Sequence, residues 1–187
     1  MTKIYLIRHA AAEGNLYRVA HGQFNSTITA QGYRQLSYLR HRFAEVELAA
    51  VYGSDLLRAH TTAAALYVPR NLPFRPEPRL REVCMGAWEQ LTWGEVARLD
   101  AEMYYNFNHR PDLFAYEGAE SFTAVRDRMR SALRDIAAAH PCVDGVELLP
   151  FRKMCQVKYD EMGLAFPFAH LPEPTPERMA KLNRLLR

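Results

Sequence analysis

Short apolar runs alternate with amphipathic stretches along the first half of the chain. Residues 4–7 (Ile-Tyr-Leu-Ile) form an apolar, β-rich run that predicts a buried strand ending at Arg8. Residues 49–52 form a second short run, which Gly53-Ser54-Asp55 closes. A helical pattern follows each run, and the order strand, helix, strand, helix predicts a three-layer α/β/α fold with a mainly parallel sheet.

Several amphipathic segments predict helices, and three of them carry capping signals. Thr92-Trp93-Gly94-Glu95 has the form of a capping box, and Ser54 or Asp55 is expected to cap the helix that follows the second strand. Thr175 before Pro176 predicts the start of a final short helix. The expected helices begin near Thr29, span 57–67, run from Thr92 through Met103, span about 121–139, and span about 176–186.

Two segments lack helical or strand periodicity. Residues 13–27 are rich in glycine, asparagine and hydroxyl side chains, so they predict a loop after the first strand, where α/β proteins bind ligands. Residues 69–78 contain four prolines and predict an extended connector that could enclose a short strand.

Composition narrows the class of protein. The 187 residues carry a net charge of +3, with 24% charged and 49% apolar residues, as expected for one folded domain or a domain with an appendage. The basic residues are scattered, so no nucleic acid partner is expected. No apolar stretch reaches the roughly 18 residues that span a bilayer, so we expect no membrane association and a cytoplasmic protein.

The three cysteines predict neither disulfides nor a metal site. Cys84, Cys142 and Cys155 are odd in number, form no Cys-x-x-Cys pair and lack histidines at zinc-ligand spacing. We therefore interpret them as thiols in a reducing compartment.

Candidate chemistry begins where the predicted strands end. Arg8 and His9 combine an anion-binding guanidinium with an imidazole that is partly neutral, hence nucleophilic, near pH 7. Arg58 follows the second strand and would point to the same edge of the sheet, and Glu82 is a carboxyl that could donate a proton. Each of these residues, taken alone, is better explained as an ordinary solvated or hydrogen-bonded side chain.

Taken together, five stretches resemble the histidine phosphatase superfamily, the phosphoglycerate mutase-like enzymes. The resemblance covers about residues 1–141, with Ala10 in place of the glycine that most members have after the histidine. The matching stretches are LIRHAAAEGN (6–15), HGQFNSTITAQGYRQ (21–35), VYGSDLLRAHTTA (51–63), LREVCMGAWEQLTWGEV (80–96) and EGAESFTAVRDRM (117–129).

The resemblance implies a role for each matching residue. His9 would be the nucleophile that forms a phosphohistidine, while Arg8, Arg58 and Asn15 bind the phosphoryl oxygens. Glu82 would protonate the leaving oxygen and then activate water. The arginines would neutralise charge without a metal or any other cofactor. The implied partners are a small phosphorylated metabolite and inorganic phosphate.

The second histidine of the family is missing from its expected place. Pro150 stands about where an apolar strand should end in Ser-His-Gly. His140 is better interpreted as a partner of a helix C-terminus. His21 and His60 lie in segments nearer the site and could compensate for the missing histidine, but both are also plausible as solvent-facing residues. We therefore expect either a phosphomonoester hydrolase with lowered turnover or a non-catalytic phosphate-binding or interaction module.

The phosphatase interpretation is favoured over a mutase. The loop after Asn15 lacks the extended tryptophan-containing pattern that the resemblance associates with glycolytic mutases.

The tail carries a second resemblance. Residues 143–187 look like the C-terminal end of glycyl-radical-enzyme activating enzymes, but the Cys-x3-Cys-x2-Cys motif that radical chemistry requires is absent. We expect a phosphatase-like domain over 1–141 and an atypical segment over 142–187, with 146–149 as a strand. An apolar patch left by the missing strand could favour a homodimer.

Overall fold

The computed structural model describes residues 4–140 and 175–184, and the chain divides into two compact units. Tyr5–Ala139 form one unit. The helix α8 (Pro176–Arg184) belongs to the other unit, and its first turn is capped as predicted, because Thr175 Oγ1 accepts a hydrogen bond from the Arg178 amide at 3.3 Å. The expected strand at 146–149 and Pro150 lie outside the described residues.

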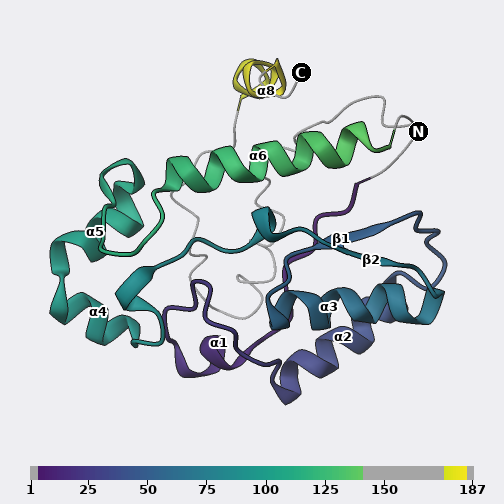
Figure 1. The fold of residues 1–187 in the computed structure, drawn as a ribbon, viewed down its shortest axis with the longest axis horizontal. Helices are drawn as coiled ribbons and strands as arrows, with labels where there is room; N and C mark the ends of the chain where they lie inside the picture. The colour runs from purple at the N-terminus through teal and green to yellow at the C-terminus, as the bar shows by residue number, and fades with distance from the viewer. Residues whose placement is uncertain (1–3, 141–174, 185–187) are drawn as a thin grey trace. The chain divides into compact units, whose positions relative to one another are not determined.

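The first unit alternates helices with two short strands (Figure 1). Most predicted helices are confirmed, including the segment over 57–67 and the one that starts after Ser121. Single 3₁₀ turns occupy 68–70, 78–80, 86–88 and 111–113. The elements are α1 (Glu13–Tyr17), α2 (Ala30–Arg42), β1 (Val51–Gly53), α3 (Leu57–Tyr67), β2 (Phe74–Pro76), α4 (Trp93–Leu99), α5 (Ala101–His109) and α6 (Phe122–Ala138).

The two strands form a parallel sheet between helices. Val51 pairs with Phe74, and Gly53 pairs with Pro76, while α3 makes the crossover and packs on both strands. Figure 1 shows α6 on one side of the sheet and α2 and α3 on the other. The α/β class with a parallel sheet is therefore confirmed, and the proline-rich connector does enclose a strand.

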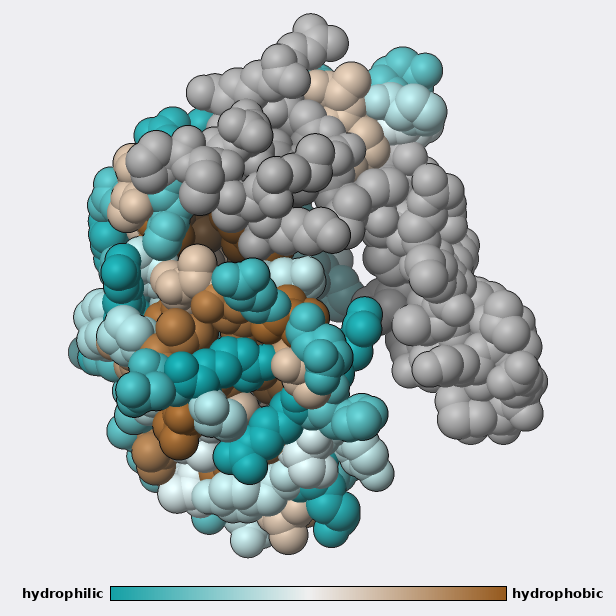
Figure 2. Space-filling view, turned by 90° about the vertical axis from the view of Figure 1, so that its right-hand side faces the viewer, coloured by the Kyte–Doolittle hydropathy of each residue, from teal (hydrophilic) through white to brown (hydrophobic). Residues whose placement is uncertain are grey.

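The predicted first strand is wrong for the described structure. Residues 4–7 are not in a strand, and their side chains are 40–84% exposed. An apolar run becomes a buried strand only when other strands pair with it and a helix covers it. Within 4–140 and 175–184 no segment pairs with these residues. Figure 2 shows hydrophobic side chains gathered across one face of the molecule.

Two other predicted elements differ in detail. The loop expected over 13–27 contains α1, and the helix expected from Thr92 through Met103 is divided at Asp100. The Asp100 backbone leaves the helical region at φ −148° and ψ 79°, and its carboxylate accepts a hydrogen bond from the Met103 amide at 2.9 Å. Asp100 thus ends α4 and caps α5.

The predicted cap of α3 is also wrong. The N-cap residue is Leu56, and the Leu57 amide donates to Asn25 Oδ1 at 2.6 Å. Ser54 Oγ instead accepts from the Leu56 amide, and Asp55 pairs with Arg81. The first turn of α3 is therefore capped by an asparagine from a distant loop and not by a neighbouring residue. A local sequence pattern cannot reveal such a cap.

Two buried clusters support the unit. One, which we call the aromatic cluster, consists of Ala20, Val83, Met85, Trp88, Val96 and Phe114. The other, which we call the small-residue cluster, consists of Ala10, Ala12, Ile28, Leu36 and Ala65. The first underlies the segment that carries Glu82, and the second underlies the segment that follows His9.

Candidate active site

The backbone after His9 is held by α2 and α3. The Ala11 carbonyl accepts from the Thr29 amide at 2.9 Å and from Thr29 Oγ1 at 3.1 Å, while the Ala10 amide donates to Thr62 Oγ1 at 3.0 Å. Gly32 of α2 packs so closely that a Cβ there would lie 2.2 Å from the Ala11 oxygen. These contacts fix the backbone that directly follows His9.

The imidazole of His9 has a defined tautomer. Its Nδ1 lies 2.8 Å from the Ala10 carbonyl oxygen, and because a carbonyl only accepts, Nδ1 carries the proton. Nε2 therefore holds the lone pair. Burial lowers the pKa of His9, and the charges of Arg58 and Arg8 lower it further, against opposing effects of the Ala10 carbonyl and Glu82. At neutral pH the ring is a neutral nucleophile.

An open pocket of about 280 Å³ adjoins His9. Arg8, His9, Ala11, Asn15 and Gln35 line it. Asn15 Oδ1 accepts from the Ala12 amide at 3.0 Å, and Gln35 Oε1 accepts from the Ala11 amide at 2.7 Å. With both amide oxygens engaged, the NH₂ groups of these side chains are left as donors. Together with a guanidinium, they suit an anion with several acceptor oxygens.

Arg58 lies beneath the site rather than at its surface. It is 2% exposed, and it donates from Nη1 to the Phe24 carbonyl at 2.9 Å and from Nη2 to the Gly22 carbonyl at 2.8 Å. Burial lowers its pKa, whereas Glu82 and Glu89 raise it. A guanidinium has five N–H donors, so three are not used by these two bonds.

Glu82 lies at the other side of the site and is exposed. Its Oε1 accepts from the Val83 amide at 3.0 Å, and its charge is close enough to raise the pKa of both His9 and Arg58. Arg128 of α6 holds this backbone, because it donates to the carbonyls of Arg79, Arg81 and Glu82 at 2.7, 2.7 and 2.9 Å.

The structure thus groups all five residues that the sequence indicated. His9, Arg8 and Asn15 line one pocket, and Arg58 and Glu82 are electrostatically coupled to His9. Sequence reasoning missed Gln35, although it closes the matching stretch 21–35 and follows Gly32 by one helical turn.

The structure also separates the two nearby histidines. The rings of His21 and His9 are 6.0 Å apart between centroids. His60 instead stacks on Tyr67 and packs against Phe74. His21 therefore belongs to the site, and His60 belongs to the packing between α3 and β2.

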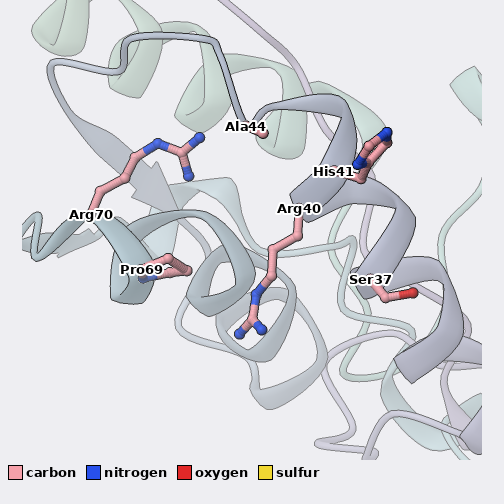
Figure 3. Close-up of a pocket in the computed structure, with 6 residues that line it drawn as sticks. All are labelled: Ser37, Arg40, His41, Ala44, Pro69 and Arg70. Atoms are coloured by element: carbon pink, nitrogen blue, oxygen red, sulfur yellow. The ribbon is translucent and has the colours of Figure 1, made fainter.

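A second pocket, of about 480 Å³, lies at the C-terminal end of α2 (Figure 3). Figure 3 shows Arg40 and Arg70 flanking it. Arg70 donates to the carbonyls of Leu66 and Phe43, so its charge supports helix ends. None of the predicted site residues lines this pocket, which consists of Ser37, Arg40, His41, Ala44, Pro69 and Arg70.

Two further findings concern the described residues alone. No group of three or more histidine, cysteine or acidic side chains in 4–140 and 175–184 could hold a metal ion. Within the same ranges, every helix is too short or too polar to cross a membrane.

Comparison with known families decides the classification. Residues 4–146 match the model of the histidine phosphatase superfamily (branch 1). The chain belongs to this superfamily. The resemblance seen in the motifs is thereby confirmed for the phosphatase-like part, and the resemblance of the tail to activating enzymes stays a prediction.

Named relatives and solved structures agree with this classification. The metal-independent phosphoserine phosphatase of Arabidopsis thaliana is 35% identical over 146 residues, covering 75% of this chain and 60% of the relative. Bacillus stearothermophilus YhfR superposes with a TM-score of 0.70 at 27% identity, covering 88% of this chain and 82% of that one.

A ligand-bound structure is also similar. The mycobacterial glucosyl-3-phosphoglycerate phosphatase Rv2419c, in its complex with inorganic phosphate, superposes with a TM-score of 0.59 at 27% identity over 71% of this chain and 61% of that one. The chain spans about two thirds of the length of the curated relatives it matches.

Proposed function

We propose that this protein hydrolyses small phosphomonoesters through a phosphohistidine formed on His9. The observation that carries the proposal is the tautomer of His9, whose Nε2 is a free lone pair beside a pocket lined by hydrogen-bond donors. A neutral nucleophile beside donors that match phosphoryl oxygens is the arrangement that phosphoryl transfer needs.

The reaction would proceed in two displacements. His9 Nε2 attacks phosphorus while the bond to the ester oxygen breaks, and the carboxylic acid of Glu82 protonates that leaving oxygen. The Glu82 carboxylate then takes a proton from water, which attacks phosphorus and breaks the P–N bond. Phosphate and neutral His9 are the products, and Glu82 regains its proton.

Arg8, Arg58 and Asn15 would hold the phosphoryl oxygens during both steps. Arg8 and Asn15 line the pocket, and Arg58 has three N–H groups beyond those that bind carbonyls. Their positive charge would replace a metal ion in neutralising the transferring group. The similarity to a metal-independent phosphoserine phosphatase supports this part of the proposal.

The alternative is a phosphate-binding module without turnover. The sequence favours it, because Pro150 stands about where the second histidine of the family is expected. In that case the same donors would bind phosphate and His9 would stay unmodified.

Turnover in the presence of a chelator separates the two functions. Wild type should release phosphate from a panel of small phosphomonoesters, His9→Ala should release none, and Arg40→Ala should match wild type because Arg40 lines the other pocket. Phosphate binding without turnover would select the binding module. Efficient phosphate shuttling with a bisphosphorylated primer would show a mutase instead.

A further inference from the structure

Gln23 joins the turn that Arg58 holds to the segment that carries Glu82. Arg58 donates to the carbonyls on either side of Gln23, those of residues 22 and 24, at 2.8 and 2.9 Å. From this turn the half-buried side chain of Gln23 reaches the Glu82 carbonyl. Gln23 therefore contacts both halves of the candidate site, the half that holds Arg58 and the half that holds the proton donor.

Both ends of the Gln23 side-chain amide are engaged. Nε2 donates to the Glu82 carbonyl at 3.2 Å and to Glu120 Oε2 at 3.2 Å, and Oε1 accepts from Arg81 Nη1 at 3.4 Å. A carbonyl and a carboxylate accept, whereas a guanidinium donates, so these partners fix the orientation of the amide. Its two N–H groups are used in these bonds, which leaves the side chain without a donor for a phosphoryl oxygen.

Two carboxylates repeat the link between the turn and the segment after Glu82. Glu89 Oε1 accepts from the backbone amide of Gln23 at 2.8 Å and from that of Met85 at 3.1 Å. Glu120 Oε2 accepts from the side chain of Gln23 and from the Cys84 amide at 2.8 Å. Each carboxylate thus binds one donor of Gln23 and one backbone donor of residues 84–85.

The charge of Glu120 strengthens this link. The hydrogen bonds from Arg128 are the main cause that lowers the pKa of Glu120, and those from the Cys84 amide and Gln23 act in the same direction, against the effect of burial. Glu120 is therefore ionised at neutral pH. Hydrogen bonds to an ionised acceptor are stronger than neutral ones, so they resist a displacement of residues 82–84 from the turn.

The position of this backbone determines where the proton donor lies. Glu82 Oε1 accepts from the Val83 amide at 3.0 Å, so the carboxyl is held against its own segment and moves with it. A general acid must lie within hydrogen-bond reach of the oxygen that it protonates. A displacement of about 1 Å can lower the rate of such a step considerably.

We propose that Gln23 is a positioning residue, which fixes the Glu82 backbone relative to the turn held by Arg58 so that the Glu82 carboxyl reaches the leaving oxygen. This inference rests on the proposed function of the same site, in which Glu82 protonates that oxygen. Gln23 acts on proton donation through Glu82, and binding of the phosphoryl group does not depend on its side chain.

Esters whose leaving groups differ in basicity test the proposal. An alkoxide needs a proton in order to leave, whereas para-nitrophenolate is a weak base and leaves without one. Gln23→Met keeps the length of the side chain and removes both N–H groups. Its kcat/KM, which reports formation of the phosphoenzyme, should fall about tenfold for ethyl phosphate and less than about twofold for para-nitrophenyl phosphate. An equal loss with both esters would overturn the proposal.

Three controls separate positioning from a general disturbance. Gln31→Met is the same substitution at an exposed glutamine of α2, and it should match wild type with both esters. Inorganic phosphate should bind Gln23→Met as it binds wild type in calorimetric titration, and a weaker affinity would count against the proposal. In a Glu82→Gln background, Gln23→Met should cause no further loss with ethyl phosphate, because the proton donor is already gone. A further loss in that background would show that Gln23 does not act through Glu82.

A measurement on the unaltered protein protects the test against a misfolded variant. In NMR spectra of wild type, the side-chain N–H protons of Gln23 should exchange with water more slowly than those of Gln31, and equal exchange would contradict the hydrogen bonds of Gln23. If wild type hydrolyses neither ester, the proposed function fails and this inference fails with it. If wild type hydrolyses both and Gln23→Met is unimpaired, this inference alone fails.

Discussion

The two sides of the candidate site are built in opposite ways. The His9 side rests on the small-residue cluster, on hydrogen bonds that Thr29 donates to the Ala11 carbonyl, and on one that Thr62 Oγ1 accepts from the Ala10 amide. The Glu82 side rests on the aromatic cluster around Trp88 and on one arginine, Arg128. One side is fixed by close approach, and the other by large buried side chains.

The difference teaches which changes each side tolerates. Where backbones are in close contact, an added atom has no space, so larger residues on the His9 side should destabilise the protein. Where large rings fill the interior, removed atoms leave cavities, so smaller residues on the Glu82 side should destabilise the protein. We therefore expect larger side chains to disturb the surroundings of the nucleophile and smaller ones to disturb the surroundings of the proton donor.

The largest effect is expected at Trp88. It is fully buried and lies 4.9–6.0 Å, between ring centroids, from Phe107, Phe114 and Tyr116. Trp88→Ala should lower the free energy of unfolding by about 3–5 kcal/mol, measured by urea denaturation. Trp93→Ala is the control and should cost less, because Trp93 is only half-buried. A loss below about 1 kcal/mol for Trp88→Ala would contradict the account.

Gly32→Ala should destabilise the His9 side of the site. The new Cβ would lie 2.2 Å from the Ala11 oxygen and 2.5 Å from Ile28 Cγ2, so we expect a loss of about 1–3 kcal/mol in the free energy of unfolding. Gly94→Ala is a matched control, because Gly94 is also in the first turn of a helix and has no atom within 4 Å of the added Cβ. The control should gain about 0.5–1 kcal/mol, and equal losses in both variants would refute close packing.

Arg128→Met sharpens the comparison on the Glu82 side. It removes three hydrogen bonds to carbonyls and the pair with Glu120, so we expect a loss of about 1.5–3 kcal/mol and a lower kcat at little changed phosphate affinity. Arg126→Met, which breaks an exposed pair with Asp127, should cost less than about 0.5 kcal/mol. If both variants behave alike, Arg128 does not position Glu82.

The smallest effect is a shift in titration on the His9 side. Because burial and two arginine charges lower the pKa of His9, its NMR titration midpoint should lie below 6.5, with the ring neutral above that midpoint. Arg8→Ala removes one positive charge, so the midpoint should rise by a few tenths of a pH unit. Arg40→Ala should leave it unchanged. A midpoint above 6.5 in wild type would contradict the neutral nucleophile.

Local sequence signals predicted most of the helices, whereas elements that depend on tertiary contacts could not be predicted from them. The capping residues Thr29, Thr92 and Ser121 act within their own helices, so their positions follow from the sequence. The strand expected at 4–7 and the cap expected at Ser54 depend on distant partners, and both predictions are wrong for the described structure.

The candidate site shows the same division. Arg8, His9 and Asn15 lie within one short stretch and were found from its motif. His21 lies in a segment that the sequence placed near the site, and the structure brings its ring beside His9. Gln35 reaches the site only because α2 folds back on that stretch. A glutamine on a helix carries no signal of its own until the fold brings it to the nucleophile.

The most direct measurement of the central claim is the location of the covalent phosphate. After brief mixing with a labelled small phosphomonoester in the presence of a chelator, the protein should carry an acid-labile label that peptide mapping places on His9 and that NMR places on Nε2. A label on Nδ1, on another residue or on no residue while ester is hydrolysed would contradict the tautomer and the mechanism built on it.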